Sequence, residues 1–172
     1  MQEPRRRLAT LVFPPADGPG GTTLRLLDRD ELPRMQRLID VLNPSIAPDV
    51  LRARVAALPD YDDYRAVGAF APATADAPAD GPDGQRLVAV CGLWDTLRPY
   101  CGRMLETDHV VVDPEMRSSV VGAALMRYVE ALARAEGFDT IELNAYHRNT
   151  RGHAFYAREG YTSIGQHFQK VL

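Results

Sequence analysis

The sequence predicts a mixed α+β fold, in which a twisted mixed sheet of about six or seven strands is flanked by four helices. Short β-branched runs alternate with segments of helical apolar spacing along the chain. Residues 103–112, 118–136 and 140–146 have the pattern strand, helix, strand. Such a crossover is right-handed and joins parallel strands, whereas the earlier strands follow one another as antiparallel neighbours.

Composition indicates an ordinary globular protein. The 172 residues are 45% hydrophobic and 25% charged, which suits one domain over residues 22–172. Residues 1–21, rich in Pro, Gly and Arg, predict a flexible tail. A net charge of -3 gives no indication of nucleic-acid binding, and no apolar run reaches the roughly 18 residues of a membrane span. Cys91 and Cys101 form no CxxC pair, so we expect a reduced, cytoplasmic protein.

The first part of the chain alternates strands and helices. Strands are expected over residues 8–13 and 22–27, the first as an edge strand. Asp28 and Glu31 have the spacing of a capping box, which opens a helix that runs to about Val41. Ser45 is the expected cap of a second helix, which ends at Leu58.

The middle of the chain predicts hairpins. Strands are expected over residues 64–70, 87–94 and 103–112, with a turn at 98–102. Residues 71–84 contain no aliphatic side chain larger than Ala, so this stretch predicts a mobile hairpin connection. After the strand at 140–146, a short helix from about Thr150 and a final strand over 161–172 complete the fold.

The stretch Val110–Leu125 organises the rest of the chain. A β-branched run ends at Asp113-Pro114, and a polar turn follows. From Gly122 on, apolar residues recur at the intervals of a helix. A strand, a tight turn and a helix N-terminus form an anion site, because backbone N–H groups of the first turn lack partners. The pattern alone is equally that of an ordinary connection. Neither a Walker lysine nor a GxGxxG motif is present.

Three motifs in order resemble those of the GCN5-related N-acetyltransferase (GNAT) superfamily, over roughly residues 85–162. Val110-Val111-Val112-Asp113-Pro114 resembles the family strand that binds the pantetheine arm. Arg117-Ser118-Ser119-Val120-Val121-Gly122 resembles its pyrophosphate turn, with Val120 in place of a glycine. That turn still presents its amides if Val120 points into the core. Residues 149–156, with Gly160-Tyr161, resemble its third signature, with Gly152 in place of an alanine.

The resemblance implies a fold whose parallel strands, 103–112 and 140–146, splay apart, and acetyl-CoA as cosubstrate. The implied coenzyme-binding residues are Val110, Val111, Val112, Arg117, Ser118, Ser119, Val120, Val121, Gly122, Ala123, Asn149 and Tyr156. Tyr156 aligns with the general acid that protonates the leaving thiolate; packing is its alternative role. Asn149 aligns with a residue that binds the coenzyme arm, and helix capping is its alternative role.

The general base has several candidates. One position that holds a glutamate in some relatives is Asn144 here, with Glu142 two residues earlier on the same strand face. Asp108 and Glu106 align with another base position and share one face, so we favour these two. A solvated pair of carboxylates or a water chain is the alternative. His109 has the opposite parity, and His147 and His153 lack partners at metal-ligand spacing, so no metal is expected.

The implied function is direct transfer of an acetyl group from acetyl-CoA to a small-molecule or peptide amine. A non-catalytic acyl-CoA-binding module of the same fold is the alternative, and a generic phosphate-binding protein is a third. Trp94, Arg98 and Tyr100 predict either an acceptor pocket or a packed aromatic turn. The family also forms dimers, some through the last strand; the sequence leaves the acceptor and the oligomeric state open.

Overall fold

A computed structural model describes residues 13–116 and 120–170 of the chain. Its sheet has six strands in the order β1 to β6. The strand bounds are Ala16–Asp17 for β1, Thr23–Leu26 for β2, Tyr64–Pro72 for β3, Gln85–Arg98 for β4, Gly102–Val112 for β5 and Thr140–Leu143 for β6. Neighbouring strands are antiparallel except β5 and β6, which are parallel as predicted.

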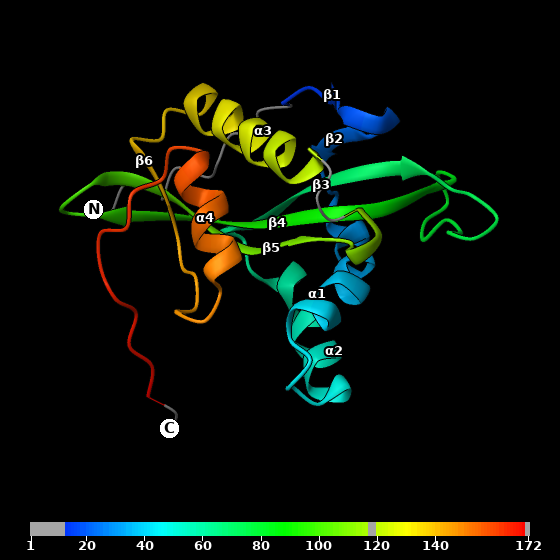
Figure 1. The fold of residues 1–172 in the computed structure, drawn as a ribbon, viewed down its shortest axis with the longest axis horizontal. Helices are drawn as coiled ribbons and strands as arrows, with labels where there is room; N and C mark the ends of the chain where they lie inside the picture. Colours follow the sequence, from blue (N-terminus) through cyan, green and yellow to red (C-terminus); the bar gives the residue numbers. More distant parts are fainter. Residues whose placement is uncertain (1–12, 117–119, 171–172) are drawn as a thin grey trace, which may run out of the picture.

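Helices cover both faces of the sheet (Figure 1). Their bounds are Gln36–Leu42 for α1, Pro48–Ala57 for α2, Val121–Ala135 for α3 and Thr150–Arg158 for α4. The α3 helix packs on one face through a buried stripe that includes Leu125, Val129 and Leu132. The α1 and α2 helices pack on the other face, where Leu38 and Leu51 meet side chains of β3, β4 and β5. These two cores bury opposite faces of the central strands. Among the described residues, no helix is long and apolar enough to cross a membrane.

The first helical segment begins as predicted. The Asp28 N–H donates to Glu31 Oε2 at 3.0 Å, which is half of a capping box. Residues Arg29–Met35 form a 3₁₀ helix that contains Pro33, and the α-helix α1 starts only after it. A proline interrupts regular α-helical hydrogen bonding, which explains the tighter first turns.

Two predicted boundaries are wrong for local reasons. The second helix starts at Pro48 with Ala47 as its cap, not at Ser45. Proline favours the first helical position because its φ is already helical and its missing N–H is not needed there. The strand predicted over 140–146 ends at Leu143, where its pairing with β5 stops, and a turn closed by the bond from Asn149 N–H to Tyr146 O follows.

The predicted final strand is not formed. Residues 161–170 contain no strand, and Ile164 and Phe168 are 75% and 86% exposed. A strand needs a partner edge, and no described strand pairs with this segment. The described part of the sheet therefore has six strands.

The predicted tail and loop are both anchored where the structure describes them. Ala16–Asp17 pairs with β2, and Pro14 O accepts a hydrogen bond from Tyr128 Oη at 2.9 Å, so the predicted flexible tail does not extend to residue 21. Most of the strand predicted over residues 8–13 lies outside the described residues. The connection between β3 and β4 has no secondary structure, as predicted, but Arg34 fixes it through Asp80 at 2.8 Å and Asp83 at 3.2 Å.

Candidate active site

A β-bulge in β5 shapes the centre of the sheet. Gly92 of β4 lies opposite Asp108, and Val90 lies opposite Val111, so β5 has one residue more than β4 between these pairs. His109 lies in this interval with φ 50°, the only positive φ of a non-glycine residue in the described chain. An extra residue of this kind bends a strand and redirects the side chains around it.

Because of the bulge, the His109 side chain lies on the other face of the sheet than predicted. Strict alternation placed His109 on the face opposite to Glu106 and Asp108. Instead, His109 Nε2 lies 3.1 Å from Asp108 Oδ2, and the imidazole lines a cavity together with α1 and α2. Its ring centroid is 6.5 Å from that of Tyr64, which packs in the core beneath α1 and α2. Asp108 and His109 therefore face the same side of the sheet.

The parallel strands separate just before the bulge. Their pairing runs from Met104 with Thr140 to Thr107 with Leu143, where β6 ends. Strand β5 continues to Val112, so on this side residues 108–112 have no strand partner among the described residues. The α4 helix lies next to this opening (Figure 1). The peptide edge at Val110–Val112 is thus open to a ligand on one side, because β4 occupies the other.

The α3 N-terminus lies beyond the end of β5. Val120 is the N-cap residue and is 65% exposed, whereas Val121 is completely buried. Val121 rather than Val120 therefore fills the core position, so the condition that Val120 points into the core is not met. The first turn of a helix presents N–H groups that have no intrahelical acceptor, here including those of Gly122 and Ala123. Arg117, Ser118 and Ser119, which the sequence also assigns to this turn, lie outside the described residues.

Gly122 allows α3 to pack closely on β5. A Cβ atom at this position would lie 3.3 Å from Val112 Cγ2 and 3.8 Å from Phe155 Cζ. A large side chain here would push α3 away from both β5 and α4. The lack of a side chain at Gly122 therefore lets the expected phosphate turn pack directly on the strand that is expected to bind the coenzyme arm.

Asn149 caps α4. Its Oδ1 accepts a hydrogen bond from Gly152 N–H at 2.9 Å, which confirms the capping role that the sequence suggested. A Cβ atom at residue 152 would lie 2.4 Å from Asn149 Nδ2, closer than such contacts occur. The glycine in place of the family alanine is thus explained by the cap that packs over it.

Tyr156 lies on α4 between two aromatic rings. Its ring centroid is 5.2 Å from that of Phe155 and 5.8 Å from that of Tyr161. Burial raises the pKa of Tyr156 to about 12, and a smaller effect comes from the neighbouring Cys91. The Tyr156 hydroxyl makes no hydrogen bond within the part of the chain that the structure describes. A phenol in this state is protonated at neutral pH and is available to donate.

The two favoured carboxylates have different surroundings. Asn144 Nδ2 donates to Glu106 Oε1 at 3.2 Å, and Arg98 Nη2 lies 3.9 Å from Glu106 Oε2. Asp108 is exposed, and its nearest charged partner is the imidazole of His109. Of the two, only Asp108 is in contact with a residue of the cavity.

The remaining sequence candidates lie further along β4 and β6. Tyr100 donates to Glu142 Oε2 at 3.2 Å, on the exposed surface. Trp94 instead packs against Tyr61 and Tyr64, with ring centroids 5.7 and 4.8 Å apart. The predicted group of Trp94, Arg98 and Tyr100 is thus divided: the tryptophan belongs to a packed aromatic cluster, and the tyrosine to the β6 side.

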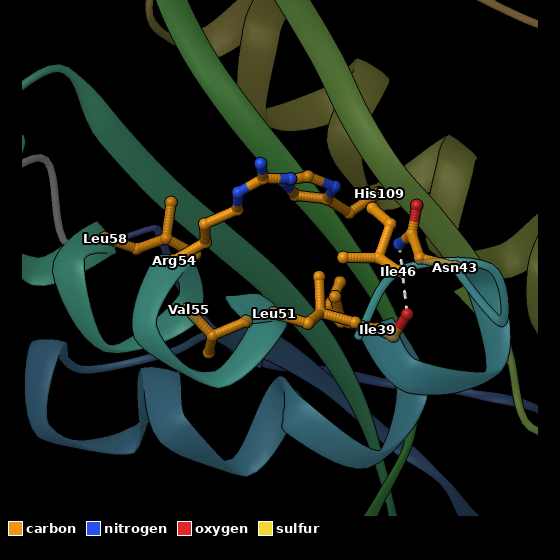
Figure 2. Close-up of a pocket in the computed structure, with 8 residues that line it drawn as sticks. All are labelled: Ile39, Asn43, Ile46, Leu51, Arg54, Val55, Leu58 and His109. Atoms are coloured by element: carbon orange, nitrogen blue, oxygen red, sulfur yellow. Dashed lines mark hydrogen bonds between the residues drawn. The ribbon is translucent and has the colours of Figure 1, made fainter. Parts of the chain in front are cut away.

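A cavity of about 140 Å³ lies between the α1–α2 hairpin and the β5 bulge. Figure 2 shows its lining side chains, Ile39, Asn43, Ile46, Leu51, Arg54, Val55, Leu58 and His109. None of these residues was singled out from the sequence as part of an acceptor site. Only the helical spacing of the aliphatic residues was visible in the sequence. In the described chain, no three His, Cys, Asp or Glu residues gather as a metal site would require.

Together these features define a class of protein: a mixed sheet whose two parallel strands separate, with a helix N-terminus beyond the end of the longer strand and the tyrosine-bearing helix α4 next to the opening (Figure 1). The model of the acetyltransferase (GNAT) family matches residues 41–161. Because this match covers more than half of the chain, the protein belongs to the GNAT acetyltransferase family.

Individual relatives agree with this assignment. An aminoalkylphosphonate N-acetyltransferase of Salmonella typhimurium is 36% identical over 67 residues, which are 39% of this chain and 44% of that relative. The chain thus matches less than half of the length of this curated relative.

Solved structures show the same fold. A ribosomal-protein-alanine N-acetyltransferase from Brucella melitensis biovar Abortus has a TM-score of 0.67 at 18% identity, with 88% of this chain and 99% of that chain covered. The aminoglycoside N-acetyltransferase AAC(6')-Iy in complex with CoA has a TM-score of 0.68 at 16% identity, with 90% and 98% covered. At such identities the likeness shows the fold alone.

Proposed function

We propose that the protein is an N-acetyltransferase that moves an acetyl group from acetyl-CoA to an amine by direct attack. The observation that carries the proposal is the opening beside β5. Its open peptide edge ends beside the N-terminus of α3, where Gly122 packs on Val112, and α4, the helix that carries Tyr156, lies next to the opening (Figure 1). Family membership supports the same reaction.

In this proposal the coenzyme lies along the end of β5. The peptide groups of Val110, Val111 and Val112 bind the pantetheine arm in place of a further strand. The pyrophosphate lies against the first turn of α3, formed by Val120, Val121, Gly122 and Ala123, where N–H groups and the helix dipole favour an anion. Arg117, Ser118 and Ser119 complete the turn, as the resemblance implies. Asn149 positions α4 and, through it, Tyr156.

The chemistry requires one nucleophile and two proton transfers. A neutral amine attacks the thioester carbonyl carbon, so an N–C bond forms while the C–S bond breaks. The thiolate of CoA leaves and takes the hydroxyl proton of Tyr156, whose pKa of about 12 keeps it protonated until that step. The proton that the amine loses passes to a base on the other side of the sheet. The products are an acetamide and free CoA thiol.

For that base we propose Asp108 acting with His109. The 3.1 Å contact between Asp108 Oδ2 and His109 Nε2 makes a carboxylate–imidazole pair that opens on the cavity. In such a pair the carboxylate orients the ring. Glu106 is the weaker candidate, because Asn144 and Arg98 already bind its carboxylate.

The proposed function is tested by measuring whether the protein acetylates amines. Purified protein is incubated with acetyl-CoA and a panel of primary amines, while free thiol release and the acetylated product are measured, the latter by mass spectrometry. Acetylation of at least one amine at a rate above the non-enzymatic rate is expected. Tight binding of acetyl-CoA without acetylation of any amine would instead support the non-catalytic coenzyme-binding module. Equal binding of CoA and of nucleotides that lack a pantetheine arm would support a generic phosphate-binding protein.

The printed names of the relatives indicate which amines belong in the panel. One name specifies aminoalkylphosphonates, another a ribosomal-protein alanine, and a third aminoglycosides. These acceptors differ in size and in charge. Because one fold serves them all, the choice among them for this chain depends on its own cavity.

A further inference from the structure

The cavity between the α1–α2 hairpin and β5 has an aliphatic floor. Ile39, Leu51 and Val55 are almost fully buried beneath it, and Ile46 and Leu58 close its sides. Small-molecule pockets typically measure roughly 300–1,000 Å³, so a cavity of about 140 Å³ suits a compact group. A short aliphatic chain fits this lining by size and by polarity.

Arg54 supplies a cation at the rim. Its side chain starts on α2 and reaches over the aliphatic residues towards the His109 ring (Figure 2). Arg54 forms no salt bridge within the part of the chain that the structure describes, whereas Arg25, Arg34 and Arg65 each pair with a carboxylate. Its guanidinium is thus free to bind an external anion bidentately.

Two other polar groups are already partly engaged. His109 pairs with Asp108, and Asn43 Nδ2 donates to Ile39 O at 3.0 Å. Of the side chains that line the cavity, Arg54 is the one whose positive charge is permanent. The cavity thus presents three zones: an aliphatic floor, a cationic rim at Arg54 and the Asp108–His109 pair.

We propose that this cavity binds the acceptor, and that the acceptor is a compact aliphatic amine that carries an anionic group, a carboxylate or a phosphonate. The anion pairs with Arg54, the carbon chain lies on Ile39, Leu51 and Val55, and the amine is directed to Asp108 and His109. A polycationic acceptor would be repelled by the guanidinium. This inference rests on the proposed acetyltransferase function.

Matched acceptors test the charge requirement. Leucine is compared with leucinamide, and 3-aminopropylphosphonate with 3-amino-1-propanol, each with saturating acetyl-CoA. The anionic member of each pair should have the higher kcat/KM, by roughly 10- to 100-fold, the range for a hydrogen bond to a charged group. Equal values within both pairs, or a preference for the neutral members, would overturn the inference.

Two variants test whether Arg54 is the residue that causes the preference for anionic amines. Arg54→Gln should remove the preference by raising KM for the anionic amines, while KM for the neutral amines and the affinity for CoA stay unchanged. Arg52→Gln is the matched control, because Arg52 lies exposed on the same helix and does not line the cavity. The inference would also be overturned if Arg54→Gln lowered kcat/KM equally for anionic and neutral amines. The same holds if Arg52→Gln removed the preference for anionic amines as Arg54→Gln does.

A binding measurement separates this inference from the proposed reaction. 4-Methylpentanoate, which is leucine without its amine, should shift the NMR signals of the His109 ring in the wild type but not in Arg54→Gln. If no amine is acetylated and this shift still occurs, the reaction fails and the anion site stands. If amines are acetylated without any charge preference and without the shift, the reaction stands and the anion site fails.

Discussion

Arg37 of α1 donates to Asp113 at the end of β5, with 2.5 Å between Nη1 and Oδ2. The same carboxylate oxygen accepts from Arg86 of β4 at 2.9 Å, and Oδ1 accepts from Glu115 N–H at 3.1 Å. Asp113 is only 2% exposed, so this network is largely shielded from solvent. One carboxylate therefore connects a wall of the proposed acceptor cavity to the turn that leads towards the proposed coenzyme site.

Asp113→Asn should lower the free energy of unfolding at pH 7. The change leaves Arg37 and Arg86 without their anion, at a cost of roughly 2 kcal/mol. This is less than for a fully buried pair, because the Arg37 side chain is 38% exposed. Urea denaturation at pH 7 measures the loss, and Asp76→Asn, at an exposed loop position, is the control.

The loss should also depend on pH. Burial alone would raise the pKa of Asp113, but the Glu115 N–H and the Arg37 guanidinium outweigh it and hold the pKa below its usual value. Such a carboxyl stabilises the fold above the unfolded pKa of about 3.9 and loses that contribution as pH falls through the lowered folded value. The difference between wild type and variant should shrink below about pH 4. A constant difference from pH 7 to pH 3 would contradict this account.

Val120→Asp should separate fold stability from coenzyme binding. Aspartate is a favoured N-cap residue, and its charge suits the helix N-terminus, so α3 should keep or gain up to about 1 kcal/mol. The same charge would repel a pyrophosphate at this turn and should weaken CoA binding by about tenfold or more. Calorimetry measures both quantities, with Val120→Asn as the neutral control. Unchanged CoA affinity in folded Val120→Asp protein would rule out the proposed phosphate position.

Tyr156→Phe should lower kcat by roughly 100-fold, the lower range for general acid catalysis, and leave CoA affinity nearly unchanged. Thiol release under saturating substrates measures the effect. Tyr161→Phe is the matched control, because this hydroxyl is buried without a hydrogen-bond partner among the described residues and its ring lies 5.8 Å from that of Tyr156. Removing an unpaired hydroxyl should be neutral or stabilising. A loss of activity only in Tyr161→Phe would transfer the acid role to that residue.

Asp108 and His109 should behave as one unit. Asp108→Asn and His109→Gln are each expected to lower kcat/KM by about 100-fold, and the double variant should be no worse than either single one. Glu106→Gln should have a much smaller effect, because Asn144 and Arg98 already bind that carboxylate. Additive losses in the double variant would show that the two residues act independently. A large loss in Glu106→Gln alone would assign the base to Glu106.

Gly152→Ala should destabilise the protein, although alanine is normally the better helix former by about 1 kcal/mol. The new methyl group would displace the Asn149 side chain, which lies 2.4 Å from the Cβ position, and the cap of α4 would be lost. A loss of about 1 kcal/mol is expected from thermal denaturation. A higher melting temperature in the variant would mean that the cap contributes little.

Much of the fold could be predicted from short-range patterns. The apolar spacing that starts near Val121 predicted α3, and the strand–helix–strand order predicted that β5 and β6 are parallel. Asn149 was a capping candidate because its spacing from Gly152 N–H is local. These features depend on periodicity and on neighbours within a few residues, which a single sequence displays directly.

The wrong predictions concern features that depend on pairing with a second strand. Alternation along β5 placed His109 on the wrong face, because a bulge is a mismatch between two strands and neither strand reveals it alone. The final strand was expected from residues 161–172, yet the described part of this segment pairs with no strand.

By itself, the sequence thus determined the order of the strands and α-helices from β2 to α4, the parallel crossover and the family to which the chain belongs. Which charged side chains contact one another depends on the tertiary structure alone. It brought Arg37 to Asp113 across 76 positions and placed Arg54 and His109 around one cavity. The physical reason is that helix and strand periodicity is encoded locally, whereas strand register and contacts between distant helices depend on how the whole core packs.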